Sequence, residues 1–123
     1  MAWNTHKKSG QFAQFLSYEK SGTVTKGTHE GKAAHITTDG KAAVGGANES
    51  FRGAISNIED DVITVQVRGL VELPYTSTAP TVGAWNKLEC GASGAVQIDD
   101  TNGVPFFVES VDTDAMTCMI DLR

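Results

Sequence analysis

The sequence Val-Ile-Thr-Val-Gln-Val-Arg at residues 62–68 decides the fold. Ile63, Val65 and Val67 alternate with more polar neighbours, so they share one face of an extended chain. Met-Thr-Cys-Met-Ile-Asp-Leu at residues 116–122 follows the same pattern, with its apolar residues on one face. β-Branched residues suit a pleated, half-buried surface. Both stretches are therefore predicted to be strands of a mainly β protein.

Turn residues predict that each of these strands belongs to a hairpin. The connections before them, residues 59–61 and 112–115, are rich in Asp, which favours tight turns. The predicted hairpins pair residues 51–58 with 62–67 and residues 106–111 with 116–122. Shorter strands are expected at residues 33–37, 87–90 and 95–98.

Glycine and proline positions predict where this β-structure is interrupted. Gly69 breaks the apolar run around it, so we expect a bulge or bend there. Residues 73–83 contain two prolines and several hydroxyl residues, which predicts a loop. Residues 11–19 fit a short helix, a strand or an extended arm, and the sequence leaves these alternatives open. No repeat of fixed period is evident.

Six to eight short strands in 123 residues predict one small β-barrel or sandwich. The expected organisation is an N-terminal arm at residues 1–20 followed by a β-rich domain at residues 21–123. No apolar run approaches the length of a membrane span, no secretory signal is expected, and two cysteines are too few for a disulfide scaffold.

The net charge of −5 is unevenly distributed. Residues 1–41 contain six lysines against three acidic residues, a net +3, whereas the remaining residues contain four basic against twelve acidic ones, a net −8. A basic head can dock on a negative partner or form a solvated surface. The acidic body argues against direct contact with nucleic acid.

Catalytic and metal-binding patterns are nearly absent from the sequence. It contains neither glycine-rich phosphate-binding motif, and Ser93 lies in an incomplete nucleophile elbow that fits a plain turn better. Cys118 is expected to be a small buried hydrophobe, and His29 and His35 are expected at the surface. The sequence therefore predicts no enzyme, no cofactor and no metal site.

One enzymatic alternative stays open at this point. A small ligand-binding or hydrolytic β-barrel would use His35 with acidic residues of two turns, Asp99, Asp100, Asp112 or Asp114, and it requires a deep polar pocket.

Aromatic residues near the N-terminus are the main candidates for contact with a partner. They either pack on the chain's own domain or anchor it to a neighbour, where aromatic side chains carry much of the binding energy. The candidates for partner contact are Trp3, Lys7, Lys8, Phe12, Phe15 and Tyr18. Tyr75 and Trp85, which flank the predicted loop, are candidates for contact between subunits.

From residue 22 onward, the spacing of glycines and strands is similar to that of a known family. The matching pieces are Phe51-x-Gly53-Ala54-Ile55, residues 62–73 with their Val-Glu-Leu ending, Gly83 to Leu88, Gly94-Ala95-Val96, and Phe107-Val108 through Leu122-Arg123. In these pieces the chain resembles the small capsid cement, or decoration, proteins of tailed bacteriophages. The first 20 residues have no counterpart in that family.

The resemblance implies a compact β-barrel or tulip-like fold, added to the outside of an assembled head, often as a trimer. It implies that the chain stabilises contacts between major capsid subunits, with the virion's outer capsid surface as its location. The expected partners are the major capsid protein and further copies of the chain, without nucleic acid or membrane. Another phage structural component, of a tail or head fibre, is the alternative.

Overall fold

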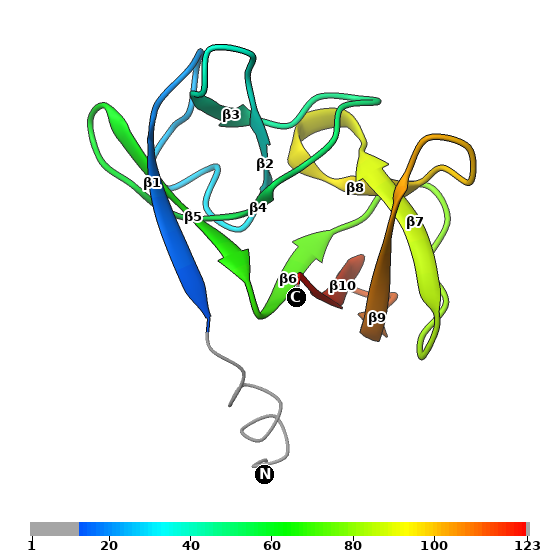
Figure 1. Ribbon diagram of the computed structural model, residues 1–123. Helices are drawn as coiled ribbons and strands as arrows, with labels where there is room; N and C mark the ends of the chain where they lie inside the picture. The colour runs from blue at the N-terminus through cyan, green and yellow to red at the C-terminus, as the bar shows by residue number, and fades with distance from the viewer. Residues whose placement is uncertain (1–12, 123) are drawn as a thin grey trace, which may run out of the picture.

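The computed structural model describes residues 13–122, which form two five-stranded antiparallel sheets that lie side by side (Figure 1). In spatial order, the first sheet contains β1 (Gln14–Glu19), β5 (Val62–Arg68), β4 (Gly53–Ile58), β2 (Ala33–Ile36) and β3 (Ala42–Val44). The second contains β6 (Leu70–Pro74), β10 (Thr117–Asp121), β9 (Val104–Asp112), β7 (Trp85–Cys90) and β8 (Val96–Ile98). The prediction of a mainly β, sandwich-like domain is confirmed.

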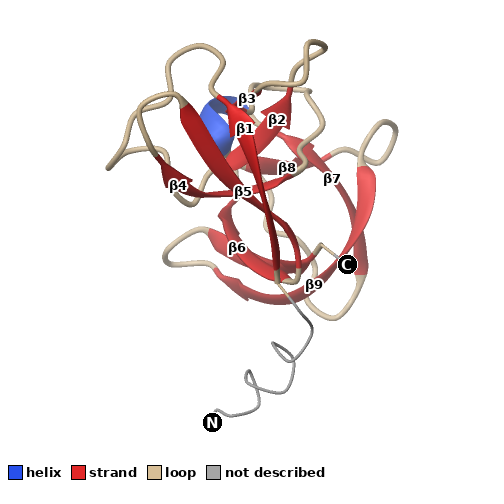
Figure 2. Cartoon of the chain, turned by 60° about the vertical axis from the view of Figure 1, so that its left-hand side comes forward, coloured by secondary structure: helices blue, strands red, loops and turns tan. Residues whose placement is uncertain are grey.

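Strands and loops make up nearly all of the described chain, and the short 3₁₀ turn Ala92–Gly94 is its one helical element (Figure 2). Both predicted hairpins form, as β4–β5 and β9–β10. The open question about residues 11–19 is settled for Gln14–Glu19, which pair with β5 as an edge strand. This part of the predicted arm therefore belongs to the first sheet, and residues 1–12 lie outside the described chain.

Each sheet curls until its two outermost strands meet at one point, without closing into a barrel. In the first sheet, Lys20 directly after β1 forms an isolated bridge with Ala42 of β3. In the second sheet, Tyr75 directly after β6 forms the same kind of bridge with Val96 of β8. Strong twist and curl of this kind are the usual way for a small sheet to wrap a core.

The two halves of the chain share one topology. In both halves the first strand lies at the edge, followed across the sheet by the fifth, the fourth, the second and the third. The isolated bridge joins the end of the first strand to the third strand in each half. The structure thus contains a repeat of about half the chain that no residue pattern revealed, and we call its parts the first half (residues 14–68) and the second half (residues 70–121).

Gly69 marks the point where the chain passes from one half to the other. Its φ of +95° lies in the region that glycine adopts most readily. The Gln66 side-chain amide donates hydrogen bonds to the carbonyls of Arg68 and Leu70 on either side of the glycine, at 3.0 and 3.1 Å. The predicted bend is confirmed, and it separates two sheets instead of interrupting one.

Both ends of the described chain lie beside this bend. The Leu122 N–H donates a hydrogen bond to the Gly69 carbonyl at 2.9 Å. A Cβ atom at Gly69 would lie 3.3 Å from the Cα of Ala13. The chain therefore enters, turns over and leaves the fold at one corner.

Each half has its own apolar core. The first core lies inside the first sheet and is formed by Val24, Ala34, Ala42, Ile55, Ile58, Ile63, Val65 and Val67. The second core contains residues of all the second-half strands together with three first-half residues, Ala33, Phe51 and Ala54. Phe51 stacks on Phe106 of β9, with ring centroids 4.9 Å apart and an interplanar angle of 22°. This contact fixes one half onto the other.

Replacing Phe51 with Ala is expected to destabilise the protein by about 3 kcal/mol, because it removes a buried ring and its stacking contact with Phe106 from the junction between the halves. Urea unfolding of the purified chain measures the change. Val82→Ala, at a side chain that is 54 % exposed, is the matched control and should change the free energy of unfolding by less than about 0.5 kcal/mol. Equal effects of the two substitutions would contradict the role of Phe51.

Candidate partner-binding surface

The described chain exposes several large apolar side chains, most of them on strands. The exposed set is Phe15, Leu16, Val62, Val82, Trp85, Val104 and Met116. We call Trp85 with its neighbour Phe107 the aromatic patch, and Phe15 with Leu16 the β1 patch. Scattered exposed apolar residues are ordinary, but rings in contact on neighbouring strands, as in the aromatic patch, make a preformed surface for a partner.

The aromatic patch lies on the outer face of the second sheet. Trp85 on β7 and Phe107 on β9 are Cα partners, and their rings meet edge to face with centroids 5.5 Å apart. Phe107 faces away from the core because its neighbours Phe106 and Val108 on the same strand are buried. Trp85 is 56 % exposed, the largest such value among the exposed apolar residues.

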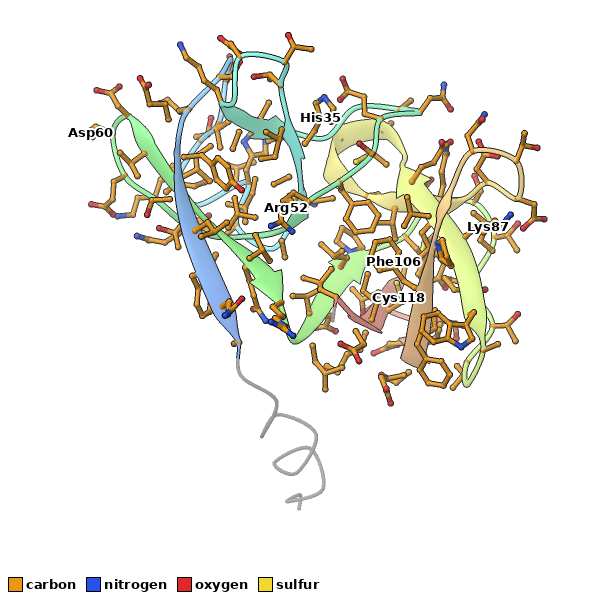
Figure 3. The ribbon with its side chains drawn as sticks, viewed as in Figure 1. His35, Arg52, Asp60, Lys87, Phe106 and Cys118 are labelled. Carbon is orange, nitrogen blue, oxygen red and sulfur yellow. The ribbon has the colours of Figure 1, made fainter. Side chains whose placement is uncertain are left out.

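The aromatic patch lies in the acidic half of the molecule. Residues 70–121 contain one basic residue, Lys87, and eight acidic ones. One of these, Asp121, is the Cα partner of Phe107 on the neighbouring strand β10. Lys87 reaches across to the Asp100 carbonyl, with its Nζ 3.4 Å from that oxygen (Figure 3). A partner of the aromatic patch would therefore combine an apolar centre with basic groups around it.

The β1 patch lies on the edge of the first sheet. Phe15 is 49 % and Leu16 is 44 % exposed, and they point to opposite faces of the strand. Tyr18, two residues further on, is half-buried and packs against the first core. Of the predicted arm residues that the structure describes, Phe15 is thus the one that offers most of its surface to a partner.

Of the remaining predicted contact residues, one is buried and four lie outside the described chain. Tyr75 is only 6 % exposed and belongs to the second core. Its predicted role beside Trp85 in a surface patch does not fit this burial, since the bridge to Val96 holds it where the sheet curls onto itself. Trp3, Lys7, Lys8 and Phe12 lie outside the described residues.

Sequence reasoning missed Phe107. The signal was present in the three consecutive apolar residues Phe106, Phe107 and Val108, because a strand with alternating faces must turn the middle one outward. It escaped notice because a central, fully buried strand shows the same run.

The acidic turns that could have formed a catalytic site lie apart from each other. Asp99 precedes β9 and Asp112 ends it, so the two carboxylates are at opposite ends of one strand. Each caps its own turn: Asp99 Oδ1 accepts hydrogen bonds from the N–H groups of Thr101 and Asn102, and Asp112 does the same two and three residues on. The hydrogen bonds from these backbone N–H groups lower the pKa of Asp99. The structure therefore does not bring the two acidic turns together in one site.

The other candidate chemical groups also have structural roles. His35 is tied to its surroundings, with Nδ1 2.8 Å from the Ser50 carbonyl oxygen and Nε2 3.6 Å from the Glu49 carboxylate. Ser93 sits inside the 3₁₀ turn with φ of 58°, as the turn interpretation predicts. Within residues 13–122 there is no cluster of three or more His, Cys, Asp or Glu side chains suited to a metal ion.

An open groove of about 520 Å³ runs between the segment after β1 and the β4–β5 hairpin. Lys20 and Lys26 line it together with Glu59 and Asp60, and Figure 3 shows Asp60 at the outer end of that hairpin. Lys26 lies 3.6 Å from Glu59, and both side chains are mostly exposed. Because charges of both signs line it, the groove favours neither an anionic nor a cationic ligand.

No family model matches the chain, and neither curated proteins nor solved structures give a significant match. No helix among the described residues has the length and apolar character needed to cross a membrane.

Both cysteines are free thiols inside the second core, which confirms the prediction for Cys118 (Figure 3). Burial, with added repulsion from Glu49 and Glu89, raises the pKa of Cys90 to about 12. Burial and Glu72 raise the pKa of Cys118 to about 11. Both thiols are therefore protonated and unreactive in the folded chain near neutral pH.

These raised pKa values predict a loss of stability at alkaline pH. Above the ordinary thiol pKa of 9.0, the unfolded chain loses protons that the folded chain retains, so the free energy of unfolding falls as pH rises from about 9 toward 12. Each thiol contributes at most about 1.4 kcal/mol per pH unit. Urea unfolding at about pH 8 and about pH 10.5 measures the slope, which should be shallower in Cys90→Ala than in the wild type. An unchanged slope would contradict the assignment to Cys90.

Proposed function

We propose that the chain is a structural virion protein that binds the outer surface of an assembled phage capsid and stabilises contacts between its major capsid subunits. The observation that carries the proposal is the preformed aromatic pair of exposed Trp85 and half-buried Phe107 on the second sheet. A surface of this kind binds a macromolecular partner with little ordering cost. The partner is taken to be the major capsid protein because residues 22–123 resemble capsid cement proteins.

The charge distribution supports the outer surface of the shell. The second half has seven more acidic than basic residues, which disfavours contact with packaged nucleic acid through repulsion. A cement protein also needs no catalytic pocket. The acidic turns, His35 and Ser93 have local structural roles, which agrees with such a function.

The N-terminal residues provide the second part of the proposed attachment. Lys7 and Lys8 with Trp3 and Phe12 combine positive charge with aromatic anchors. Because β1 begins at Gln14, only residues 1–12 can be removed without taking a strand from the first sheet. Deleting the whole predicted arm, residues 1–20, would also remove all of β1.

The test uses expanded heads of the phage that encodes the chain. Full-length protein should cosediment with heads at a saturating copy number, and deletion of residues 1–12 should weaken binding at least tenfold, an expected loss of about 1.4 kcal/mol or more. Thermal unfolding checks that the shortened chain still folds. Absence of saturable binding by the full-length protein would refute the proposed function, whereas undiminished binding after the deletion would refute only the role of the N-terminal residues.

Reversing the charge of one N-terminal lysine tests whether these residues attract the head, as distinct from an effect of the protein's net charge. Lys8→Glu should weaken head binding about threefold or more, and the loss should shrink at high salt. Lys26→Glu is the matched control, because Lys26 is an exposed lysine of the folded domain, and it should leave the affinity within about twofold. Electron microscopy of decorated virions locates the protein, and labelling of tails or fibres instead of the head would favour the alternative structural role.

A further inference from the structure

The turn between β8 and β9 contains Asn102-Gly103, the one Asn-Gly pair in the sequence. Asn102 is exposed at the surface of this turn. The side-chain amide carbon of an asparagine can be attacked by the backbone nitrogen of the next residue. A following glycine leaves that nitrogen most accessible, because it has no Cβ and adopts many backbone conformations. The pair therefore brings a nucleophile and an electrophile together.

The packing of the second sheet requires the glycine of this pair. A Cβ at Gly103 would lie 2.6 Å from the Asp99 carbonyl oxygen and 2.8 Å from the backbone nitrogen of Leu88 on β7. Both are main-chain atoms, so neither can move aside as the end of a flexible side chain would. Any side chain at position 103 would push the turn away from β7. The reactive nitrogen is thus a consequence of the fold.

Hydrogen bonds hold this nitrogen in an unreactive position. The Gly103 N–H donates to the Asp99 carbonyl oxygen at 2.9 Å. The Asp99 side chain fixes the same turn, since its Oδ1 accepts hydrogen bonds from the N–H groups of Thr101 and Asn102 at 2.9 and 3.0 Å. The Gly103 N–H must give up its bond before the nitrogen can lose its proton and turn toward Asn102. Attack therefore requires the turn to open.

We infer that Asn102 is a site of spontaneous deamidation and that the Asp99 side chain, by capping the turn, controls its rate. The Gly103 nitrogen loses its proton and forms a bond to Cγ of Asn102. The bond from Cγ to Nδ2 breaks, and the side-chain nitrogen takes up a proton and leaves as ammonia. The product is a cyclic imide, which a water molecule opens at either of its carbonyl carbons. The reaction needs only water, so it is independent of the proposed function.

The two products differ in their backbone. Opening at Cγ gives aspartate, whereas opening at the main-chain carbonyl carbon gives isoaspartate, whose backbone runs through Cγ and is longer by a methylene group. Both place a new carboxylate in a turn that already contains Asp99 and Asp100. Only isoaspartate shifts Gly103 relative to β7, next to the pair formed by Val104 and Leu88. Isoaspartate should therefore destabilise the second sheet.

The first test incubates the purified chain in mildly alkaline buffer and follows each asparagine by peptide mapping with mass spectrometry. In the urea-unfolded chain, Asn102 should convert fastest, and in the folded chain its rate should fall about tenfold. Asn57 and Asn86 are internal controls, because Ile58 and Lys87 follow them and shield the attacking nitrogen. Both should convert slowly in either state.

The second test removes the cap. Asp99→Ala should accelerate deamidation of folded Asn102 about fivefold, because the turn opens more often. Asp112→Ala is the matched control, since Asp112 Oδ1 caps the β9–β10 turn through the N–H groups of Asp114 and Ala115. It should leave the rate at Asn102 unchanged. Circular dichroism checks that both variants fold.

A third variant separates the cap from its charge. Asp99→Asn keeps a side-chain oxygen that can accept the same hydrogen bonds but removes the negative charge, so its rate should stay within about twofold of the wild type. Acceleration as large as in Asp99→Ala would mean that charge repulsion, not the cap, slows the reaction, and would overturn the proposed control.

The products are tested by their stability. Asn102→Asp reproduces the new charge without the longer backbone, so it should unfold at the same urea concentration as the fresh chain. An aged chain rich in isoaspartate should unfold at a lower concentration, and equal midpoints would contradict the expected shift of Gly103. Conversion of Asn102 no faster than that of Asn57 in the unfolded chain would overturn the site itself. Equal rates in the folded and unfolded chains, or equal acceleration by Asp112→Ala, would overturn control by the turn.

Discussion

The fold depends on the burial of first-half residues in the core of the second half. Ala33 and Ala54 of the first sheet, together with Phe51 just before β4, pack into the core of the second half. This requires β4 to be apolar on both faces, so that Gly53, Ala54 and Ile55 are all buried in succession. Glycine is needed at position 53 because β4 and the neighbouring strand β5 approach closely there: a Cβ at Gly53 would lie 1.9 Å from the Gln66 carbonyl oxygen. This shared core joins the two curled sheets into one domain.

The division into two halves also describes the charge asymmetry of the chain better than an N-terminal arm does. The net +3 of residues 1–41 suggested a basic arm, yet Lys20, Lys26, Lys32 and Lys41 belong to the folded first half. That half contains six basic and seven acidic residues and is close to neutral. The acidic excess is confined to the second half, which also exposes Trp85. The molecule is thus divided electrostatically where it is divided structurally, at Gly69.

The strands could be predicted from sequence because alternation of apolar residues is a local property. Ile63, Val65 and Val67 revealed β5 without knowledge of its neighbours, and the Asp-rich turns revealed both hairpins. Which sheet a strand joins depends on contacts between distant residues, so nothing near Gly69 showed that β5 and β6 would separate. Tyr75 was misplaced for a similar reason, because the curl that buries it depends on the partnership with Val96.

The internal repeat was hidden because the halves share strand order and register but few side chains. At matching positions, one half has alanines where the other has aromatic residues. The equivalent isolated bridges are formed by Lys20 in the first half and by Tyr75 in the second. Backbone hydrogen bonds can hold the same topology with different side chains, provided that apolar and polar residues still alternate along the strands. The candidate surface followed the same rule: exposure at Trp85 was expected from its flanking a loop, whereas exposure at Phe107 required knowledge of its strand's buried neighbours.

The meeting of Ala13 and Leu122, the ends of the described chain, at Gly69 has a practical consequence for peptides attached at these two positions. A peptide fused before Ala13 and one fused after Leu122 would leave the domain at the same corner, between the two sheets. Two fused ligands would then be held within a few residues of each other and could bind a bivalent target together. The same proximity would allow the ends to be joined by a short linker, with new termini opened in the loop after β6, so the domain is suited to circular permutation.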